Sequence, residues 1–321
     1  MSKKILITND IPEKGIALLR QAGFEVTVWT GPIPMPAADL ERLCQQHDAL
    51  LCTSPDKINA GFLKTCSHLD IISQFAAGYD NIDIAVAAEL GIPIGNAPNA
   101  MSEATADIAF GLMIVVARKM FFLHKKIERG QWGPFYPQAH LGIELKGKTL
   151  GIFGLGNIGL EMARRCKGAY SMDIIYYNRN RNLTAEKELG ATWVTFEHLL
   201  AQSDILSVHC ALTDETRGIF NAGVFQKMKP SALFINTSRG GVHNETDLIA
   251  ALKNGVIAGA GLDVTNPEPM YPDNPLLAME NAAVLPHIGS ATVEARNEMS
   301  RLAAQNIVDF YQTGNVSHRV V

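Results

Sequence analysis

The chain has 321 residues, a length typical of two domains, and its 47% hydrophobic and 19% charged residues are ordinary for a globular protein with a sizeable core. The formal net charge of −4 arises without a long run of like charge, which argues against nucleic acid or an acidic membrane surface as a partner. The most apolar stretch, Ile108–Ala117, is too short to span a bilayer, which takes about 20 residues.

The N-terminal residues and the cysteines predict the cellular compartment. An apolar strand pattern begins at Lys4, which leaves no room for a signal peptide. The cysteines are odd in number and lack C-x-x-C spacing, so they predict reduced, mostly buried thiols and neither a disulfide framework nor a zinc site. They are Cys44, Cys52, Cys66, Cys166 and Cys210. We therefore expect a cytoplasmic protein without a bound metal.

The first hundred residues alternate short apolar strands with helical patterns, which is typical of a parallel sheet with helices on both faces. Helices are expected between the strands, for example over 15–21 and 37–45. A long helix is predicted from Glu103 to Glu128, with Ser102 as its N-cap and Gly130 ending it. The expected strands are 5–8, 26–29, 49–53, 71–75 and 92–94.

A second alternating series starts at Lys148, and a last long helix is predicted over 292–312, ended by Gly314. We therefore predict an α/β protein with two doubly wound parallel-sheet domains. A domain of residues 101–289 is inserted in a domain of residues 1–100 and 290–321, which both ends of the chain build together. A site is expected in the cleft between them, at the carboxyl ends of the strands. The strands expected in this series are 150–153, 174–177, 205–209, 232–235, 259–262 and 284–285.

The loop Gln131–Glu144 is too aromatic for an ordinary solvated linker, because it contains Trp132, Phe135, Tyr136 and His140. A contact with a partner subunit and a flap over the substrate are the two functional interpretations, and local packing is the plain structural one.

Three glycines in G-x-G-x-x-G spacing follow an apolar run that starts at Thr149: Gly154, Gly156 and Gly159. The first permits a tight turn from strand to helix, the second lets a pyrophosphate approach the backbone, and the third lets the helix pack closely on the strand. Phosphates then lie at a helix N-terminus, where free N–H groups and the helix dipole favour anions. The motif predicts a dinucleotide site that opens in the middle of the chain.

The residues that follow the next strand predict which dinucleotide is bound. An Asp or Glu about 20 residues past the glycines would favour NAD, because it would repel a 2′-phosphate. This chain has Asn178 and Arg179 there instead, followed by Asn180 and Arg181, and guanidinium groups suit phosphate geometry. We predict a preference for NADPH over NADH; the structural alternative is that the arginines are simply solvated.

Three later segments of the chain each contain a polar residue just after, or close to, an expected strand. Arg239 comes just after a buried strand and before two glycines, Glu268 lies between two prolines after Asp263, and His287 stands before a helix. Each has an ordinary structural explanation by itself. Together, at strand ends around a nucleotide site, they predict a catalytic group of residues.

On these residues the sequence resembles the D-isomer-specific 2-hydroxyacid dehydrogenase family along essentially its whole length. That resemblance implies a Rossmann cofactor domain inserted in a flavodoxin-like substrate domain. Motifs at both ends of the chain match in family order. They are Ala76–Asp83, Glu103–Asp107, Gly154–Gly159, Asn236–Gly240, Gly261–Val264, Pro267–Pro269 and Pro286–Ser290.

The resemblance also implies roles for the site residues. Arg239 would bind the substrate carboxylate and polarise the keto oxygen, and His287 would give a proton to that oxygen as hydride arrives at carbon. Glu268 would pair with His287 and favour its protonated form. The backbone N–H groups of Ala77 and Gly78 would hold the other side of the carboxylate. Substrate contact is also implied for Ser290, and cofactor contact for Thr105, Asn157, Ile158, His209, Thr237, Ser238, Asp263 and His287.

Two further residues bear on the branch of the family. Asn244 stands where many relatives carry Asp, and we interpret it as a helix N-cap, a role that both residue types fill. Glu268 argues against formate dehydrogenases, relatives in which Gln stands at that position.

Within the family the chain is most similar to glyoxylate/hydroxypyruvate reductases and 2-ketogluconate reductases. The resemblance implies NADPH-dependent reduction of glyoxylate and hydroxypyruvate to D-2-hydroxy acids, and a homodimer with the helix 103–128 as its contact. Other D-2-hydroxyacid dehydrogenase activities, 2-ketogluconate reduction and, more remotely, phosphite oxidation are the alternative enzyme functions. A nucleotide-sensing corepressor of the same fold, and a methyltransferase use of the glycine turn, are alternatives of other classes.

Overall fold

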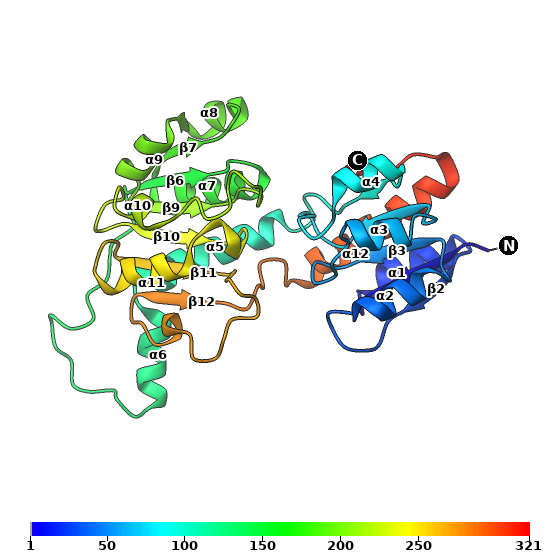
Figure 1. Cartoon of the computed structure of the whole chain (residues 1–321). Helices are drawn as coiled ribbons and strands as arrows, with labels where there is room; N and C mark the ends of the chain where they lie inside the picture. The colour runs from blue at the N-terminus through cyan, green and yellow to red at the C-terminus, as the bar shows by residue number, and fades with distance from the viewer. Residues whose placement is uncertain (1) are drawn as a thin grey trace. The chain divides into compact units, whose positions relative to one another are not determined.

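The computed structural model describes residues 2–321, which divide into two compact units (Figure 1). One unit contains the described residues up to Met101 together with Ala291–Val321, and the other is Ser102–Ser290. Each unit builds its own parallel sheet.

The first unit contains a five-stranded parallel sheet in the order β2-β1-β3-β4-β5. All four residues of the central strands β3 and β4 are buried, including the polar Ser73 and Gln74 at the end of β4. Such strands form where helices cover both faces of a parallel sheet. The bounds are β1 Lys4–Ile7, β2 Glu25–Val28, β3 Ala49–Cys52, β4 Ile71–Gln74 and β5 Ile94–Gly95.

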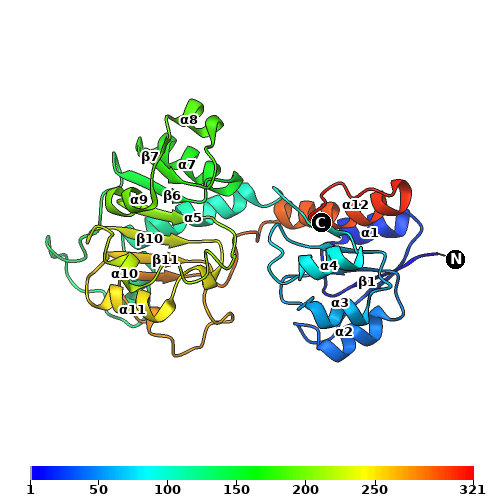
Figure 2. The same cartoon turned by 45° about the horizontal axis from the view of Figure 1, so that its top comes forward.

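Helices cover both faces of this sheet (Figure 2). One face carries α1 (Glu13–Gln21) and α12 (Val293–Thr313), and the other carries α2 (Ala37–Cys44), α3 (Ala60–Thr65) and α4 (Ile84–Leu90). The C-terminal helix α12 is joined closely to α1, because the Ser300 hydroxyl accepts from the Gly15 N–H at 3.0 Å. The two ends of the chain therefore build one unit together.

The second unit contains a seven-stranded parallel sheet in the order β12-β11-β10-β9-β6-β7-β8. The strand order reverses between β6 and β9, and ligands of open α/β sheets bind at the carboxyl ends of the strands beside such a reversal. The bounds are β6 Thr149–Phe153, β7 Asp173–Tyr177, β8 Thr192–Trp193, β9 Ile205–Val208, β10 Leu233–Asn236, β11 Gly259–Leu262 and β12 Ala282–Val284.

Two apolar layers pack against this sheet. One contains buried side chains of α5 and α7, and the other contains those of α9, α10 and α11. The helix α8 lies beside α7, and α6 follows α5. The helices are α5 Ser102–Ala117, α6 Met120–Glu128, α7 Asn157–Tyr170, α8 Leu183–Leu189, α9 Phe196–Gln202, α10 Ala222–Phe225 and α11 Glu245–Lys253, with 3₁₀ turns η1 Gly240–Val242 and η2 Pro275–Leu277.

The two parallel sheets confirm the predicted α/β class, but the single helix predicted over Glu103–Glu128 is wrong. The structure divides it into α5 and α6 at Lys119, whose φ of 54° ends the first helix. Ser102 is the first residue of α5 rather than a residue before it. The expected N-cap at Asn244 is confirmed, since its side chain accepts from the N–H of Asp247 at 3.1 Å.

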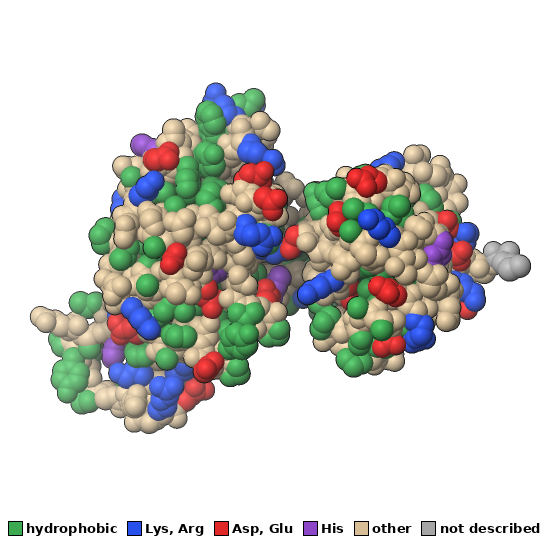
Figure 3. Space-filling model, in the orientation of Figure 1, with side chains coloured by type: hydrophobic (Ala, Val, Ile, Leu, Met, Phe, Trp, Pro, Cys, Tyr) green, Lys and Arg blue, Asp and Glu red, His purple; other side chains and the backbone are tan. Residues whose placement is uncertain are grey.

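The aromatic loop that follows α6 is exposed (Figure 3). Trp132 is 81% exposed, Phe135 89% and Tyr136 63%, and α6 itself has no buried residue. Local packing within the chain therefore does not account for these aromatic side chains. Figure 3 shows hydrophobic side chains at this loop, at the lower left of the view.

Candidate functional site

The glycine turn joins β6 to α7 at the reversal of strand order. Gly154 has a φ of +96°, and a Cβ there would lie 2.7 Å from the backbone nitrogen of Cys210, after β9. A Cβ on Gly159 would lie 2.8 Å from the carbonyl oxygen of Gly154. A Cβ on Gly156 would meet no atom within 4 Å. The fold itself requires the first and third glycines, whereas the second leaves the start of α7 open to a ligand.

This opening fits the pyrophosphate of a dinucleotide. The helix α7 is 14 residues long and begins at Asn157, so the N–H groups of its first turn, which includes Ile158, form the positive end of a helix dipole. Asn157 is exposed and Ile158 half-buried. Backbone N–H groups and a glycine without neighbours are the features that a phosphate group requires here.

Asn178, just after β7, holds the glycine turn. Its side-chain oxygen accepts from the N–H of Leu155 at 2.6 Å, and its side-chain nitrogen donates to the carbonyl of Leu155 at 3.2 Å. The nitrogen of Asn182 also donates to that carbonyl, at 3.0 Å. The side chain of Asn178 therefore shapes the turn, besides standing where an acidic residue would select NAD.

The two predicted arginines differ in their surroundings. Arg181 donates from Nε to Glu186 at 3.0 Å and forms an ion pair with the same carboxylate. The hydroxyl of Tyr176 donates to Glu186 at 2.6 Å, and together these two groups lower the pKa of Glu186 to about 2. Arg179 is exposed, and the charge of Arg179 acts on Glu215. Arg179 is thus the arginine better placed to meet a phosphate.

His209 and Thr237 follow the neighbouring strands β9 and β10. The His209 ring lies between two hydroxyl groups, with Nε2 at 2.8 Å from the Ser207 Oγ and Nδ1 at 3.4 Å from the Thr237 Oγ1. Burial lowers the pKa of His209 to about 4, so the ring is neutral near pH 7. Both residues lie at the carboxyl edge of the sheet, His209 after β9, which borders the reversal, and Thr237 after β10, the next strand.

The loop after β10 presents Arg239, which is half-buried. The side-chain oxygen of Asn236 accepts from the N–H of Ser238 at 2.9 Å and from its hydroxyl at 2.8 Å. The guanidinium of Arg239 donates through Nη1 to the Ser238 carbonyl at 2.8 Å. A Cβ on Gly240 would collide with the carbonyl of Thr265, so the loop also packs tightly against the segment after β11.

Asp263 holds the loop that contains His287. Its two carboxylate oxygens accept from the N–H groups of Ile288 at 2.8 Å and Gly289 at 2.7 Å. Its own carbonyl accepts from the N–H of His287 at 2.9 Å. Asp263 is 1% exposed, and burial raises the pKa of its carboxyl group, although the two N–H donors act in the opposite direction. Asp263 therefore holds the backbone of residues 287–289 in place.

His287 itself lies in an unusual backbone conformation. Its φ is +53°, in the left-handed region that non-glycine residues rarely adopt, and such strain is characteristic of functional sites. Its Nδ1 is hydrogen-bonded to the carboxylate of Glu268. Because a carboxylate only accepts hydrogen bonds, Nδ1 donates and Nε2 is left for a reacting group. The side chains of both residues are about 40% exposed, at 42% and 37%.

The residues around this pair come from neighbouring elements of the same unit. A Cβ on Gly289 would lie 3.1 Å from the methyl group of Thr105, which is buried at the start of α5. Ser290 follows directly and is half-buried. The structure therefore brings Thr105, Asp263, Glu268 and His287 together around one loop.

The predicted carboxylate loop, Ala77 and Gly78, follows β4 in the other unit. The side-chain nitrogen of Asn96 donates to the carbonyl of Ala77 at 2.8 Å, and that of Gln74 donates to the carbonyl of Gly78 at 3.4 Å. Both carbonyls are therefore held by the protein, and both residues are half-buried. Sequence reasoning did not identify Gln74 or Asn96, and it included Asn236 only as the first residue of the motif Asn236–Gly240; polar residues at the end of a buried strand were the available signal.

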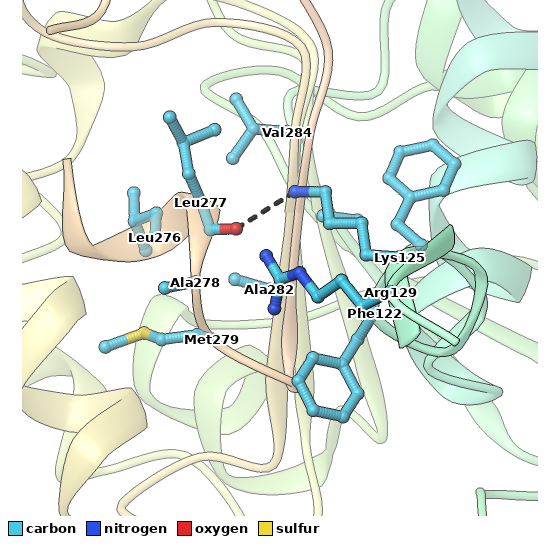
Figure 4. Close-up of a pocket in the computed structure, with 11 residues that line it drawn as sticks. Phe122, Lys125, Arg129, Leu276, Leu277, Ala278, Met279, Ala282 and Val284 are labelled. Carbon is cyan, nitrogen blue, oxygen red and sulfur yellow. Dashed lines mark hydrogen bonds between the residues drawn. The ribbon is translucent and has the colours of Figure 1, made fainter. Parts of the chain in front are cut away.

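A small pocket elsewhere in the second unit lies between α6 and the segment from η2 to β12 (Figure 4). Phe122 and Lys125 of α6 and Arg129, which follows the helix, line it, and Lys125 donates to the carbonyl of Leu277 at 3.0 Å. Its cavity volume is about 40 Å³. None of the predicted site residues lines this pocket. Within residues 2–321, none of the helices is both long and apolar enough to cross a bilayer.

A family model and full-length relatives of this chain point to the same enzyme family. The family described as "D-isomer specific 2-hydroxyacid dehydrogenase, NAD binding domain" matches residues 110–289. Glyoxylate reductase of Thermococcus litoralis is 44% identical over 97% of this chain and 94% of its own length. Glyoxylate reductase/hydroxypyruvate reductase of Mus musculus is 39% identical over 95% of this chain and 94% of its own length.

Among solved structures, the NADPH-dependent glyoxylate/hydroxypyruvate reductase of Sinorhizobium meliloti, in complex with NADP and malonate, superposes with a TM-score of 0.85. It is 31% identical and covers 100% of this chain and 97% of its own. The glycine turn, Asp263, Glu268 and His287 lie within the matched NAD-binding domain. The chain therefore belongs to the D-isomer-specific 2-hydroxyacid dehydrogenase family of NAD(P)-dependent oxidoreductases.

Proposed function

We propose that the protein reduces glyoxylate and hydroxypyruvate to D-2-hydroxy acids, with a preference for NADPH. The observation that carries this proposal is the hydrogen-bonded pair of His287 and Glu268 beside Asp263, at the carboxyl edge of a sheet with a dinucleotide turn. The names of the relatives in Thermococcus litoralis, Mus musculus and Sinorhizobium meliloti support the choice of substrates.

His287 is the proton donor in this proposal. Its Nδ1 is engaged by Glu268, so Nε2 gives the proton to the substrate's keto oxygen as that oxygen gains negative charge. The Glu268 carboxylate orients the ring and stabilises its protonated form by charge and hydrogen bond. Asp263 accepts hydrogen bonds from the N–H groups of Ile288 and Gly289, and these bonds hold the loop, with His287 in its strained backbone conformation, before substrate binds.

Arg239 binds the carboxylate of the keto acid and polarises the keto oxygen, since a planar guanidinium offers two parallel donors. The N–H groups of Ala77 and Gly78 bind the carboxylate as well. Asn96 holds the carbonyl of Ala77, which orients the peptide group that carries the N–H of Gly78, and Gln74 holds the carbonyl of Gly78. Ser290, directly after the His287 loop, supplies a hydroxyl for the substrate.

The nicotinamide cofactor, when bound, supplies the hydride. Gly154, Gly156 and Gly159 with the first turn of α7 hold its pyrophosphate, and Asp263 offers an acceptor to the carboxamide of the nicotinamide. The remaining groups proposed to contact it come from α5 and from the ends of β7, β9 and β10. They are Thr105, Asn157, Ile158, Asn178, Arg179, Arg181, His209, Thr237, Ser238 and His287.

The NADPH preference rests on Arg179. It is exposed next to Asn178, and no carboxylate follows β7 at the position that would repel a 2′-phosphate. Arg181 contributes less, because Glu186 already binds its guanidinium. The Sinorhizobium meliloti relative, named as NADPH-dependent and solved with NADP, agrees with this preference.

We also propose that the protein forms a homodimer. The helix α6 has no buried residue, and the aromatic loop after it exposes Trp132 and Phe135, so this region offers an apolar surface to a second copy. The helix α5, by contrast, packs against α7 and the sheet of its own unit. Size-exclusion chromatography with light scattering tests the dimer, and a monomer would contradict it.

The proposed function is tested with a panel of 2-keto acids and both cofactors. Glyoxylate and hydroxypyruvate with NADPH are expected to give the highest kcat/KM, and 2-ketogluconate and larger keto acids lower values. Arg239→Lys should chiefly raise KM for the keto acid, because the point charge of lysine cannot form two parallel bonds. Absence of NADPH consumption with every keto acid, together with capture of a binding partner, would favour a corepressor-like function instead.

A further inference from the structure

The loop that carries Arg239 ends at a fully buried histidine. His243 is 1% exposed and follows the 3₁₀ turn Gly240–Val242. Its Nδ1 lies 3.0 Å from the side-chain nitrogen of Asn236, and its ring packs edge-on against Phe234. Within residues 2–321, its Nε2 is the buried side-chain nitrogen or oxygen for which no hydrogen-bond partner is found.

The unpartnered Nε2 of His243 lowers the stability of the folded protein. The amide nitrogen of Asn236 can only donate, so Nδ1 of His243 accepts and the ring proton lies on Nε2. A buried N–H without an acceptor destabilises the folded protein, whereas an aliphatic side chain would fill this apolar place without that cost. Burial also lowers the pKa of His243 to about 4, which keeps Nδ1 an acceptor near neutral pH.

The other ring nitrogen of His243, Nδ1, fixes the orientation of the Asn236 amide group. Asn236 uses both ends of its amide group on the loop after β10. Its nitrogen donates to the carbonyl of Arg239 at 3.0 Å and to His243, while its oxygen accepts from the N–H and the hydroxyl of Ser238. If the amide lost its contact with His243, rotation about the Asn236 side chain would disturb its contacts with both Ser238 and Arg239.

We propose that His243 is a positioning residue for Arg239, acting through Asn236. The inference rests on the proposed function, in which Arg239 binds the substrate carboxylate. The links are continuous: His243 orients the Asn236 amide, the amide holds Ser238, and the Ser238 carbonyl accepts from Nη1 of Arg239 at 2.8 Å. On the opposite side, the contact of Gly240 with Thr265 leaves the loop little room for another shape.

His243→Leu removes the acceptor while keeping an apolar side chain of moderate size. We expect KM for the keto acid to rise about tenfold, the equivalent of one hydrogen bond, with KM for NADPH within about twofold of the wild type. The melting temperature should stay within about 3 °C of the wild type, because the variant removes the unpartnered Nε2–H but leaves one amide N–H of Asn236 without its acceptor. A purely structural histidine would give the opposite result, with lower stability and unchanged KM.

Two amide variants distinguish the contribution of Nδ1 from that of Nε2. His243→Asn places an amide oxygen near the position of Nδ1 and should restore KM, whereas His243→Gln places it near the position of Nε2 and should not. This pair decides the question even if His243→Leu does not fold. The neighbouring Asn244→Ala removes the N-cap of α11 and is the matched control, expected to lower the melting temperature without changing KM.

Arg239→Lys, measured beside these variants, distinguishes the two possible failures. If it raises KM for the keto acid while His243→Leu leaves KM unchanged, the role of Arg239 stands and the positioning role of His243 is wrong. If neither variant changes KM, the proposed role of Arg239 is itself wrong, and the inference falls with it. Equal KM values for the Asn and Gln variants would also overturn the inference.

Discussion

A substitution of Asp263 tests whether its carboxylate holds His287 in place. Asp263→Asn keeps the shape of the side chain but replaces one acceptor oxygen by an NH₂ group. That group would face the N–H of Ile288 or of Gly289, which now lie 2.8 and 2.7 Å from the carboxylate. Two donors then point at each other, and the loop containing His287 must shift.

The structure suggests a moderate effect on stability and a large one on the rate. A hydrogen bond to a charged group contributes about 1.5–3 kcal/mol, but burial raises the pKa of Asp263, so its desolvation offsets part of this gain. We expect the free energy of unfolding to fall by about 1–2 kcal/mol. A reacting group displaced by about 1 Å costs roughly 100-fold, so kcat should fall by about that factor.

Asp204→Asn is the matched control for this prediction. Asp204 lies at the opposite edge of the same sheet, where it accepts from the N–H of Thr149 and from Lys229, both at 2.9 Å. Its variant should lose stability in urea unfolding but keep the wild-type kcat. The reasoning is refuted if Asp263→Asn retains kcat within about twofold, or if Asp204→Asn loses as much activity.

Three further predictions address the cofactor, the proton donor and the response to acid. Arg179→Asp should reduce or invert the preference for NADPH, measured as the ratio of kcat/KM for the two cofactors; a wild type that prefers NADH would contradict the assignment. Glu268→Gln should lower kcat for ketone reduction, because His287 loses the carboxylate that orients its ring and balances its charge; an unchanged kcat would argue against the pair. Burial lowers the pKa of His243 from 6.5 to about 4, so the unfolded chain takes up this proton first, and stability should fall as pH drops from about 6.5 towards 4, by up to about 3 kcal/mol. Urea unfolding at several pH values measures this loss, which His243→Asn should reduce; an equal loss in that variant would exclude His243 as its source.

Much of the fold could be predicted because its strands are short, apolar and separated by clear helical patterns. The strand predicted over 259–262 is β11 itself, and that over 174–177 lies within β7. The two-residue β8 was not predicted, since both of its residues are exposed and lack the apolar pattern of a buried strand.

The continuous helix predicted over 103–128 shows the limit of this reasoning. The apolar pattern continues through the break between α5 and α6, which depends on one residue, Lys119, with positive φ. Lysine gives no local signal for such a conformation, because Gly, Asn and Asp are the usual residues there. Propensity therefore favoured one long helix where the fold has two.

The candidate site could be predicted as motifs, but its contacts could not. Arg239, Glu268 and His287 could be singled out by their places near strand ends, whereas the contact of Glu186 with Arg181 depends on how α8 packs after β7. The link between Asn236 and His243 likewise joins two residues that a turn brings together. Hydrogen-bond partners of this kind depend on tertiary packing, which sequence periodicity does not report.

The central claim is that His287 gives the proton in an NADPH-dependent reduction of a small 2-keto acid. The most direct measurement is kcat for hydroxypyruvate with NADPH, in the wild type and in His287→Ala, with the configuration of the product determined. We predict that the wild type forms D-glycerate and that kcat falls by about 10²–10⁴-fold in the variant, while NADPH binding is retained. Turnover of the variant at nearly the wild-type rate, or formation of the L-product, would contradict this account.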